Sequence, residues 1–121
     1  MSSPAAPADS NALFVNLAVE AWRFARVFAR AVSRLEVTDQ SKYIGQQRYF
    51  LQRLEQALEA VELRLVGFDG SRFDPGLPIT AVNLSDFGPE DELVIDQTIE
   101  PAVLGPNGVV RMGSATLRKA G

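Results

Sequence analysis

The densest group of side chains that could do chemistry in this sequence is acidic. Asp86, Glu90, Asp91 and Glu92 fall within one short stretch rich in turn-forming residues. Closely spaced carboxylates could bind a divalent cation or act as general acid and base. Their spacing matches neither the calcium loop of an EF-hand nor a zinc site. A solvated acidic loop is the favoured interpretation, and an enzyme that uses this loop is a distant alternative.

The sequence contains no histidine and no cysteine. It therefore lacks the commonest general base, the commonest metal ligand and any thiolate nucleophile. Serines are present, but none stands in a Ser-x-x-Lys pair, so a serine nucleophile would lack an obvious activator. No glycine-rich phosphate loop follows a predicted strand. We expect a protein that is not an enzyme, with no catalytic, cofactor-binding or metal-binding residues.

A strip of arginines marks one side of a predicted helix near the N-terminus: Arg23, Arg26, Arg30 and Arg34. Guanidinium groups at helical spacing could bind phosphates, or they could form the wet side of a helix whose other sides are covered. The chain has 12 basic and 15 acidic residues and a net charge of −3. This balance favours the wet strip and argues against a nucleic-acid partner.

The predicted helix that carries these arginines begins after Asp9-Ser10 and runs to about Val37. Its stretch of residues 14–35 is apolar around most of the helix circumference. Two lines of apolar residues at steps of three and four lie side by side along it. A helix of this kind must be covered on several sides. The first line is Phe14, Leu17, Ala21, Phe24, Phe28, Ala31 and Leu35, and the second is Val15, Ala18, Trp22, Ala25, Ala29 and Val32.

A second predicted helix, residues 41–66, has one apolar seam, which Phe50 and Ala57 widen. The bland interpretation is a hairpin of two helices within one chain. Because one seam cannot cover the wide apolar face of the first helix, we expect a second copy to complete a four-helix arrangement. The expected dimer interface consists of Phe14, Leu17, Ala21, Trp22, Phe24, Phe28 and Leu35.

Composition changes after Val66, where glycine, proline and aspartate become frequent and helical periodicity stops. Alternating side chains predict strands over residues 79–84, 93–104 and 109–117, with Leu93, Ile95, Ile99 and Val103 on one face of the second strand. Pro101 predicts an edge or a bulge in that strand. The Asn107-Gly108 pair predicts a tight turn before the third strand, since both residues tolerate positive φ.

These patterns predict an α+β protein with three parts. Residues 1–10 form a disordered tail, residues 11–66 a helical hairpin or coiled-coil dimerisation region, and residues 67–118 a small antiparallel β domain. The apolar content of 46% suits a globular core. No apolar run approaches the roughly 20 residues of a membrane span, and the N-terminus lacks the features of a signal peptide. We expect a cytoplasmic protein without a membrane partner.

The second half of the chain resembles GrpE, the nucleotide exchange factor of bacterial Hsp70 chaperones. Gly67-Phe68 and the stretch from Ser71 to Leu77 (SRFDPGL) are similar to the family's G-V and x-F-D-P-x-L. Further positions agree in order: Ala81-Val82 with the end of H-E-A-V, Ile95 and Ile99 with the V and L before G-Y, and Val109-Val110-Arg111, Ala115 and Leu117 with the family's last strand. The chain departs from the family at Pro78, at Ala102-Val103 and at Met112-Gly113, and its helical part is shorter.

The resemblance implies a dimeric co-chaperone without cofactors. In the family, helices form the dimer, and a β wing binds the ATPase domain of Hsp70 and holds its cleft open, so that ADP leaves. Matching positions imply that Phe73, Pro75, Ile99 and Leu117 face an Hsp70-type ATPase. All four could instead be core residues of the β domain. The alternative from another class is a helical dimerisation module with a β appendage that serves as a structural adaptor.

Overall fold

The computed structural model describes residues 7–121, with side-chain surroundings from residue 11 onward. The chain divides into two compact units, Met1–Val61 and Glu62–Gly121. The first is helical and the second is built of strands, so the predicted α+β class is confirmed. The predicted tail lies outside the described residues up to position 6, and the backbone of residues 7–10 belongs to the first helix.

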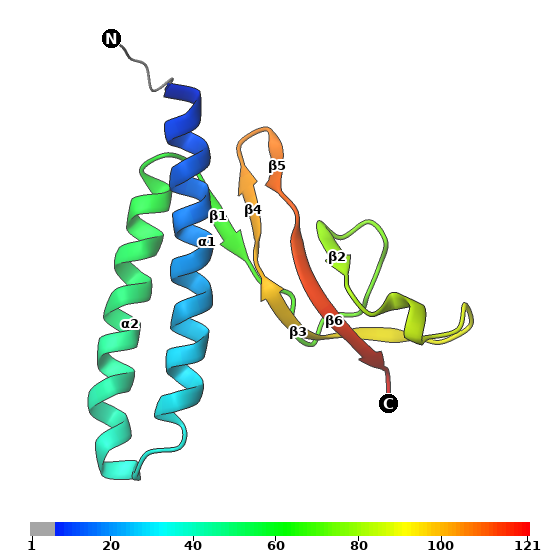
Figure 1. Ribbon diagram of the computed structural model, residues 1–121, viewed down its shortest axis with the longest axis horizontal. Helices are drawn as coiled ribbons and strands as arrows, with labels where there is room; N and C mark the ends of the chain where they lie inside the picture. The colour runs from blue at the N-terminus through cyan, green and yellow to red at the C-terminus, as the bar shows by residue number, and fades with distance from the viewer. Residues whose placement is uncertain (1–6) are drawn as a thin grey trace. The chain divides into compact units, whose positions relative to one another are not determined.

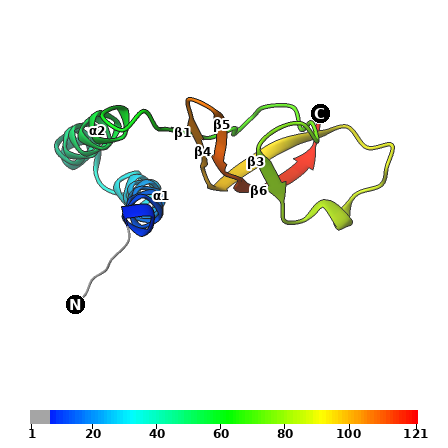
Figure 2. The same ribbon diagram turned by 90° about the horizontal axis from the view of Figure 1, so that it is seen from above.

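The helical unit is an antiparallel hairpin of α1 (Pro7–Val32) and α2 (Val37–Glu59), which lie side by side (Figure 1). Figure 2 looks nearly along their axes. Both helices differ from the sequence prediction at their ends. The first helix ends at Val32 instead of continuing to about Val37, and the second begins four residues earlier than predicted, at Val37.

The polar stretch of residues 38–41 (Thr-Asp-Gln-Ser) predicts the turn between the helices, but the chain reverses earlier, between Val32 and Val37. The backbone oxygen of Glu36 accepts hydrogen bonds from the backbone N–H groups of Asp39 and Gln40, which begins α2. Asp39 then lies in the first turn, where a negative charge favours the helix. The Gln40 side chain donates to the backbone oxygen of Leu35 (2.9 Å), satisfying an acceptor of the turn. These polar residues therefore support the helix instead of interrupting it.

The second helix is shorter than predicted at its C-terminal end. It ends at Glu59, and Glu62 adopts a left-handed backbone with φ of 61°. Residues 64–66, which the sequence pattern assigned to the end of this helix, instead form strand β1 (Arg64–Val66) and pair with a distant strand. The boundary between the two units therefore precedes the one predicted at residues 66 and 67.

The β unit consists of two small three-stranded sheets and a short 3-10 helix, η1 (Leu84–Asp86). One sheet has the order β1-β4-β5 and the other β2-β6-β3. All pairs are antiparallel except β2 with β6, so the predicted antiparallel domain is in fact mixed. The other strands are β2 (Ile79–Ala81), β3 (Leu93–Glu100), β4 (Ala102–Gly105), β5 (Gly108–Arg111) and β6 (Gly113–Lys119).

Two residues mark the point where the chain passes from one sheet to the other. Pro101 separates β3 from β4, which sequence patterning predicted as one strand, and this agrees with its inability to donate a ladder hydrogen bond. On the return path Met112 separates β5 from β6. A Cβ atom on Gly113 would lie 2.5 Å from the backbone oxygen of Glu100, so only glycine fits there.

The core of the β unit lies on the β2-β6-β3 sheet. Its centre is formed by Ile79, Leu93, Ile95, Ala115 and Leu117. Aromatic and aliphatic residues from the connecting loops pack against it: Phe68, Phe73, Leu77, Ala81 and Phe87. Register shifts on β3, between Ile95 and Gln97 and between Thr98 and Glu100, break the alternation. Ile99 therefore does not share the buried face of Leu93 and Ile95, contrary to the prediction.

Candidate functional site

The most unusual surface of the helical unit is the apolar side of α1. Leu17 and Phe24 expose 68% and 67% of their surface, and Leu13 is exposed to the same degree. Single exposed apolar residues are ordinary, but large ones in a row along one helix are typical of an interaction surface. The spacing of Leu13, Leu17 and Phe24 places them on one side of the helix.

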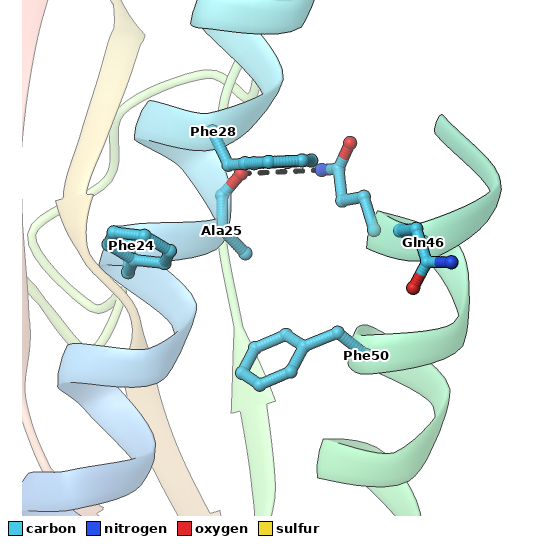
Figure 3. A pocket seen from close by; sticks show the side chains of 6 residues that line it. Phe24, Ala25, Phe28, Gln46 and Phe50 are labelled. Atoms are coloured by element: carbon cyan, nitrogen blue, oxygen red, sulfur yellow. Dashed lines mark hydrogen bonds between the residues drawn. The ribbon is translucent and has the colours of Figure 1, made fainter. Parts of the chain in front are cut away.

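A depression of about 140 Å³ lies between the two helices beside this row (Figure 3). Phe28 on α1 and Phe50 on α2 point across the gap between the helices, and Phe24 borders the depression on its outer side. Gln47 also lines the depression, and its side chain donates to the backbone oxygen of Ala25 (3.4 Å). The depression is therefore lined mainly by aromatic carbon.

A second, wider depression, of about 540 Å³, continues along the same side of the hairpin. Phe50 borders both depressions, so they join into one surface. We call this surface the hairpin face. Its members are Phe14, Leu17, Ala21, Phe24, Phe28, Phe50 and Leu54.

An aromatic contact joins α1 to α2 at the end of the hairpin face near the turn between the two helices. The rings of Phe28 and Tyr43 meet edge to face with their centroids 6.3 Å apart. This geometry is favoured by the ring quadrupoles. Since the contact joins α1 to α2, it fixes Phe28 at the border of the smaller depression.

The structure brings together five of the seven residues expected at a dimer interface, all of them on the hairpin face: Phe14, Leu17, Ala21, Phe24 and Phe28. Leu35 is exposed but lies in the turn beyond α1. Trp22 lies elsewhere on the helix and is half-buried, with the guanidinium of Arg26 stacked 4.8 Å from the centre of its ring. We therefore leave Trp22 out of the candidate site.

On α1 the arginine strip follows a different side from the hairpin face, and its last member, Arg34, lies in the turn beyond the helix. Arg23, Arg30 and Arg34 are exposed, and Arg23 pairs with Glu20 at 3.2 Å. Arg26 is half-buried, and its guanidinium stacks on the ring of Trp22. The aliphatic stems of such side chains shield apolar surface while their charges stay in water.

The four residues that the GrpE resemblance places against a partner divide into two pairs. Leu117 is only 3% exposed in the core of the β unit, and Phe73 is half-buried against the same core. Their side chains serve folding, and we withdraw Leu117 as a contact residue. Pro75 is exposed and Ile99 exposes 37% of its surface, so both are accessible.

The acidic stretch contributes to the local structure of the β unit. The carboxylate of Asp91 accepts the backbone N–H of Gly88 (2.8 Å), and Lys119 lies 4.0 Å from its other oxygen. Glu92 pairs with Arg72. Within residues 7–121, no group of three or more potential ligands is arranged to hold a metal ion.

In comparisons with protein-family models, curated proteins and solved structures, nothing matches this chain. Among the described helices, none is long and apolar enough to cross a membrane. The structural observation that points to a function is therefore the hairpin face itself.

Sequence reasoning placed Phe50 and Leu54 on the second helix but left them out of the interface. The signal was available, because Phe50 widens the seam of that helix on one side. What the sequence did not provide was the rotation of α2 about its axis, which brings Phe50 between the two depressions.

Proposed function

We propose that this chain is a non-enzymatic, dimeric interaction protein, and specifically a GrpE-like co-chaperone of an Hsp70-type ATPase. The observation that carries the dimer is the hairpin face, on which Leu17 and Phe24 are two-thirds exposed. Covering it with the same face of a second copy would bury aromatic surface on both sides and place four helices together. The self-complementary contact explains why these residues are apolar.

The β unit supports the co-chaperone part of the proposal through its accessible residues. Pro75 and Ile99 match motif positions of the family and are exposed. The carboxylate of Asp74, from the same F-D-P stretch, accepts the backbone N–H of Gly76 (2.9 Å) and shapes the turn that presents Pro75. The factor would act by binding the open state of its partner more tightly than the closed state.

The direct test is release of a fluorescent ADP analogue from an Hsp70-type ATPase of the same organism. Adding the protein is expected to accelerate release, and Ile99→Glu is expected to reduce that acceleration at unchanged dimer mass. Val109→Glu is the matched control, because Val109 is also exposed on a strand of the β unit but lies outside the proposed contact. No acceleration by the wild-type protein would contradict the co-chaperone assignment.

A structural adaptor is the second candidate, and the same hairpin face favours it. The two candidates share the dimer and differ in the partner. An Hsp70-type ATPase that is captured by the immobilised dimer and released by ATP supports the co-chaperone. A dimer that captures a different, nucleotide-insensitive partner supports the adaptor.

A further inference from the structure

The connection between β4 and β5 is a tight turn that contains the sequence pair Asn107-Gly108. Gly105 pairs with Gly108, which leaves only Pro106 and Asn107 between the paired positions. Gly108 has a φ of 121°, and among the described non-glycine residues only Glu62 has a positive φ. Of the Asn-Gly pair, only the glycine therefore has the positive φ that the pair predicts.

Both residues of this pair are open to solvent. Asn107 and Gly108 are exposed, and no hydrogen bond of the Asn107 side chain is present within the described part of the chain. A Cβ atom placed on Gly108 would have nothing within 4 Å. The strand that follows, β5, lies at the edge of its sheet, so it pairs on one side only. Short edge hairpins of this kind open locally more readily than core strands.

We propose that Asn107 is a site of self-catalysed deamidation. The backbone nitrogen of Gly108 gives its proton to water and attacks the side-chain carbonyl carbon of Asn107. The bond from that carbon to the side-chain nitrogen breaks, this nitrogen takes up a proton from water, and ammonia leaves. Water then opens the resulting five-membered succinimide at either carbonyl. The products are aspartate and isoaspartate, and the sum of the reaction is asparagine plus water giving either product plus ammonia.

The other three asparagines of the sequence lack this combination of features. Asn83 is held at both ends, since its amide donates to the backbone oxygen of Leu117 (3.0 Å) and its oxygen accepts the Leu117 N–H (2.8 Å). Asn11 and Asn16 lie within α1, whose backbone dihedrals are fixed by the helix. Each of the three precedes a residue with a side chain, which crowds the attacking nitrogen, whereas Asn107 precedes glycine.

The two products differ in their effect on the hairpin. Both add a negative charge to a chain whose net charge is already −3. Aspartate keeps the backbone length and suits a turn. Isoaspartate routes the backbone through the side chain and adds a methylene group between the paired glycines. We therefore expect it to disturb the pairing of Leu104 with Val109.

The test uses the full chain, incubated in neutral and in mildly alkaline buffer and then analysed by peptide mapping and mass spectrometry. We expect conversion at Asn107, faster in the alkaline buffer, ahead of the other three asparagines. Asn107→Gln is the control, since glutamine would have to form a larger ring, and it is expected to stay unmodified. A urea-unfolded sample of the same chain shows how fast the unrestrained pair reacts.

Two results would overturn the proposal. One is an intact Asn107 in the folded chain, whether or not the unfolded chain converts. The other is earlier conversion of a different asparagine. Neither result would bear on the proposed dimer or on the co-chaperone role, because Asn107 belongs to neither surface.

Discussion

Glu62 carries a backbone conformation that suits glycine better than glutamate. Its φ of 61° lies in the left-handed region, just after α2 ends. Replacing it with glycine removes the clash between Cβ and the backbone but adds freedom to the unfolded chain. We expect Glu62→Gly to raise the free energy of unfolding by about 0.5–1 kcal/mol, measured by urea denaturation.

The control for this change is the same substitution inside α2. Glu55→Gly lies in an exposed helix interior and should lower stability by about 1 kcal/mol. If Glu62→Gly destabilises the protein as much as Glu55→Gly does, the backbone at Glu62 is not strained.

Gly113 is the opposite case to Glu62, because glycine is present there and a side chain would not fit. A Cβ atom there would lie 2.5–2.9 Å from backbone atoms of residues 100–102, which cannot move without disturbing the passage between the sheets. We expect Gly113→Ala to cost about 1–3 kcal/mol of stability, read from the urea midpoint. Gly108→Ala offers a comparison in which only backbone strain acts, because nothing lies near that position. An alanine at residue 113 with wild-type stability would contradict the close approach of these strands.

At the scale of elements, Asn83 extends the pairing of β2 with β6 by means of its side chain. Its amide group makes two hydrogen bonds with the backbone of Leu117, as a neighbouring strand would. Asn83→Ala would leave both backbone groups of this core residue without their partners. The expected loss is about 2 kcal/mol, with faster amide hydrogen exchange at Leu117. Unchanged exchange at Leu117 in Asn83→Ala would show that water replaces the side chain without cost.

The elements also show which features could be predicted from the sequence. Two helices followed by strands were predictable because the apolar spacing changes from three and four to two. Pro101 predicted the break in the long β3–β4 segment. The strand at residues 64–66 was not predictable, because Leu65 continues the helical seam and the partner strand β4 lies far along the chain. Long-range pairing overrode the local pattern there.

The candidate site was predictable in part for the same reason. The apolar side of α1 can be read from its spacing, and five of its predicted residues do line the hairpin face. Trp22 belongs to the second apolar line of the first helix. Its stacking with Arg26 depends on side-chain packing, which the spacing of residues along the sequence does not predict. Leu117 matches a family motif, yet it lies in the core. Strand residues that alternate inward usually serve the core, whatever motif they match.

At the scale of the whole molecule, the hairpin face and the accessible part of the β unit have separate tasks in the proposed function. Phe24 is two-thirds exposed, so a charge there should not unfold the chain. A charge would, however, be buried without a partner in a dimer. We expect Phe24→Asp to give a folded monomer that still presents the β unit but accelerates ADP release less, because the dimer is lost. A Phe24→Asp protein that stays dimeric would remove the hairpin face from the interface.

The most direct test of the central claim is the mass of the protein in solution, measured by light scattering at several concentrations. We expect twice the mass of a single chain for the wild-type protein and a single-chain mass for Phe24→Asp. Val37→Asp is the matched control. Val37 is 79% exposed on α2, outside the hairpin face, so this variant should remain dimeric. A wild-type protein that is monomeric at every concentration would contradict the dimer and leave the hairpin face without its proposed role.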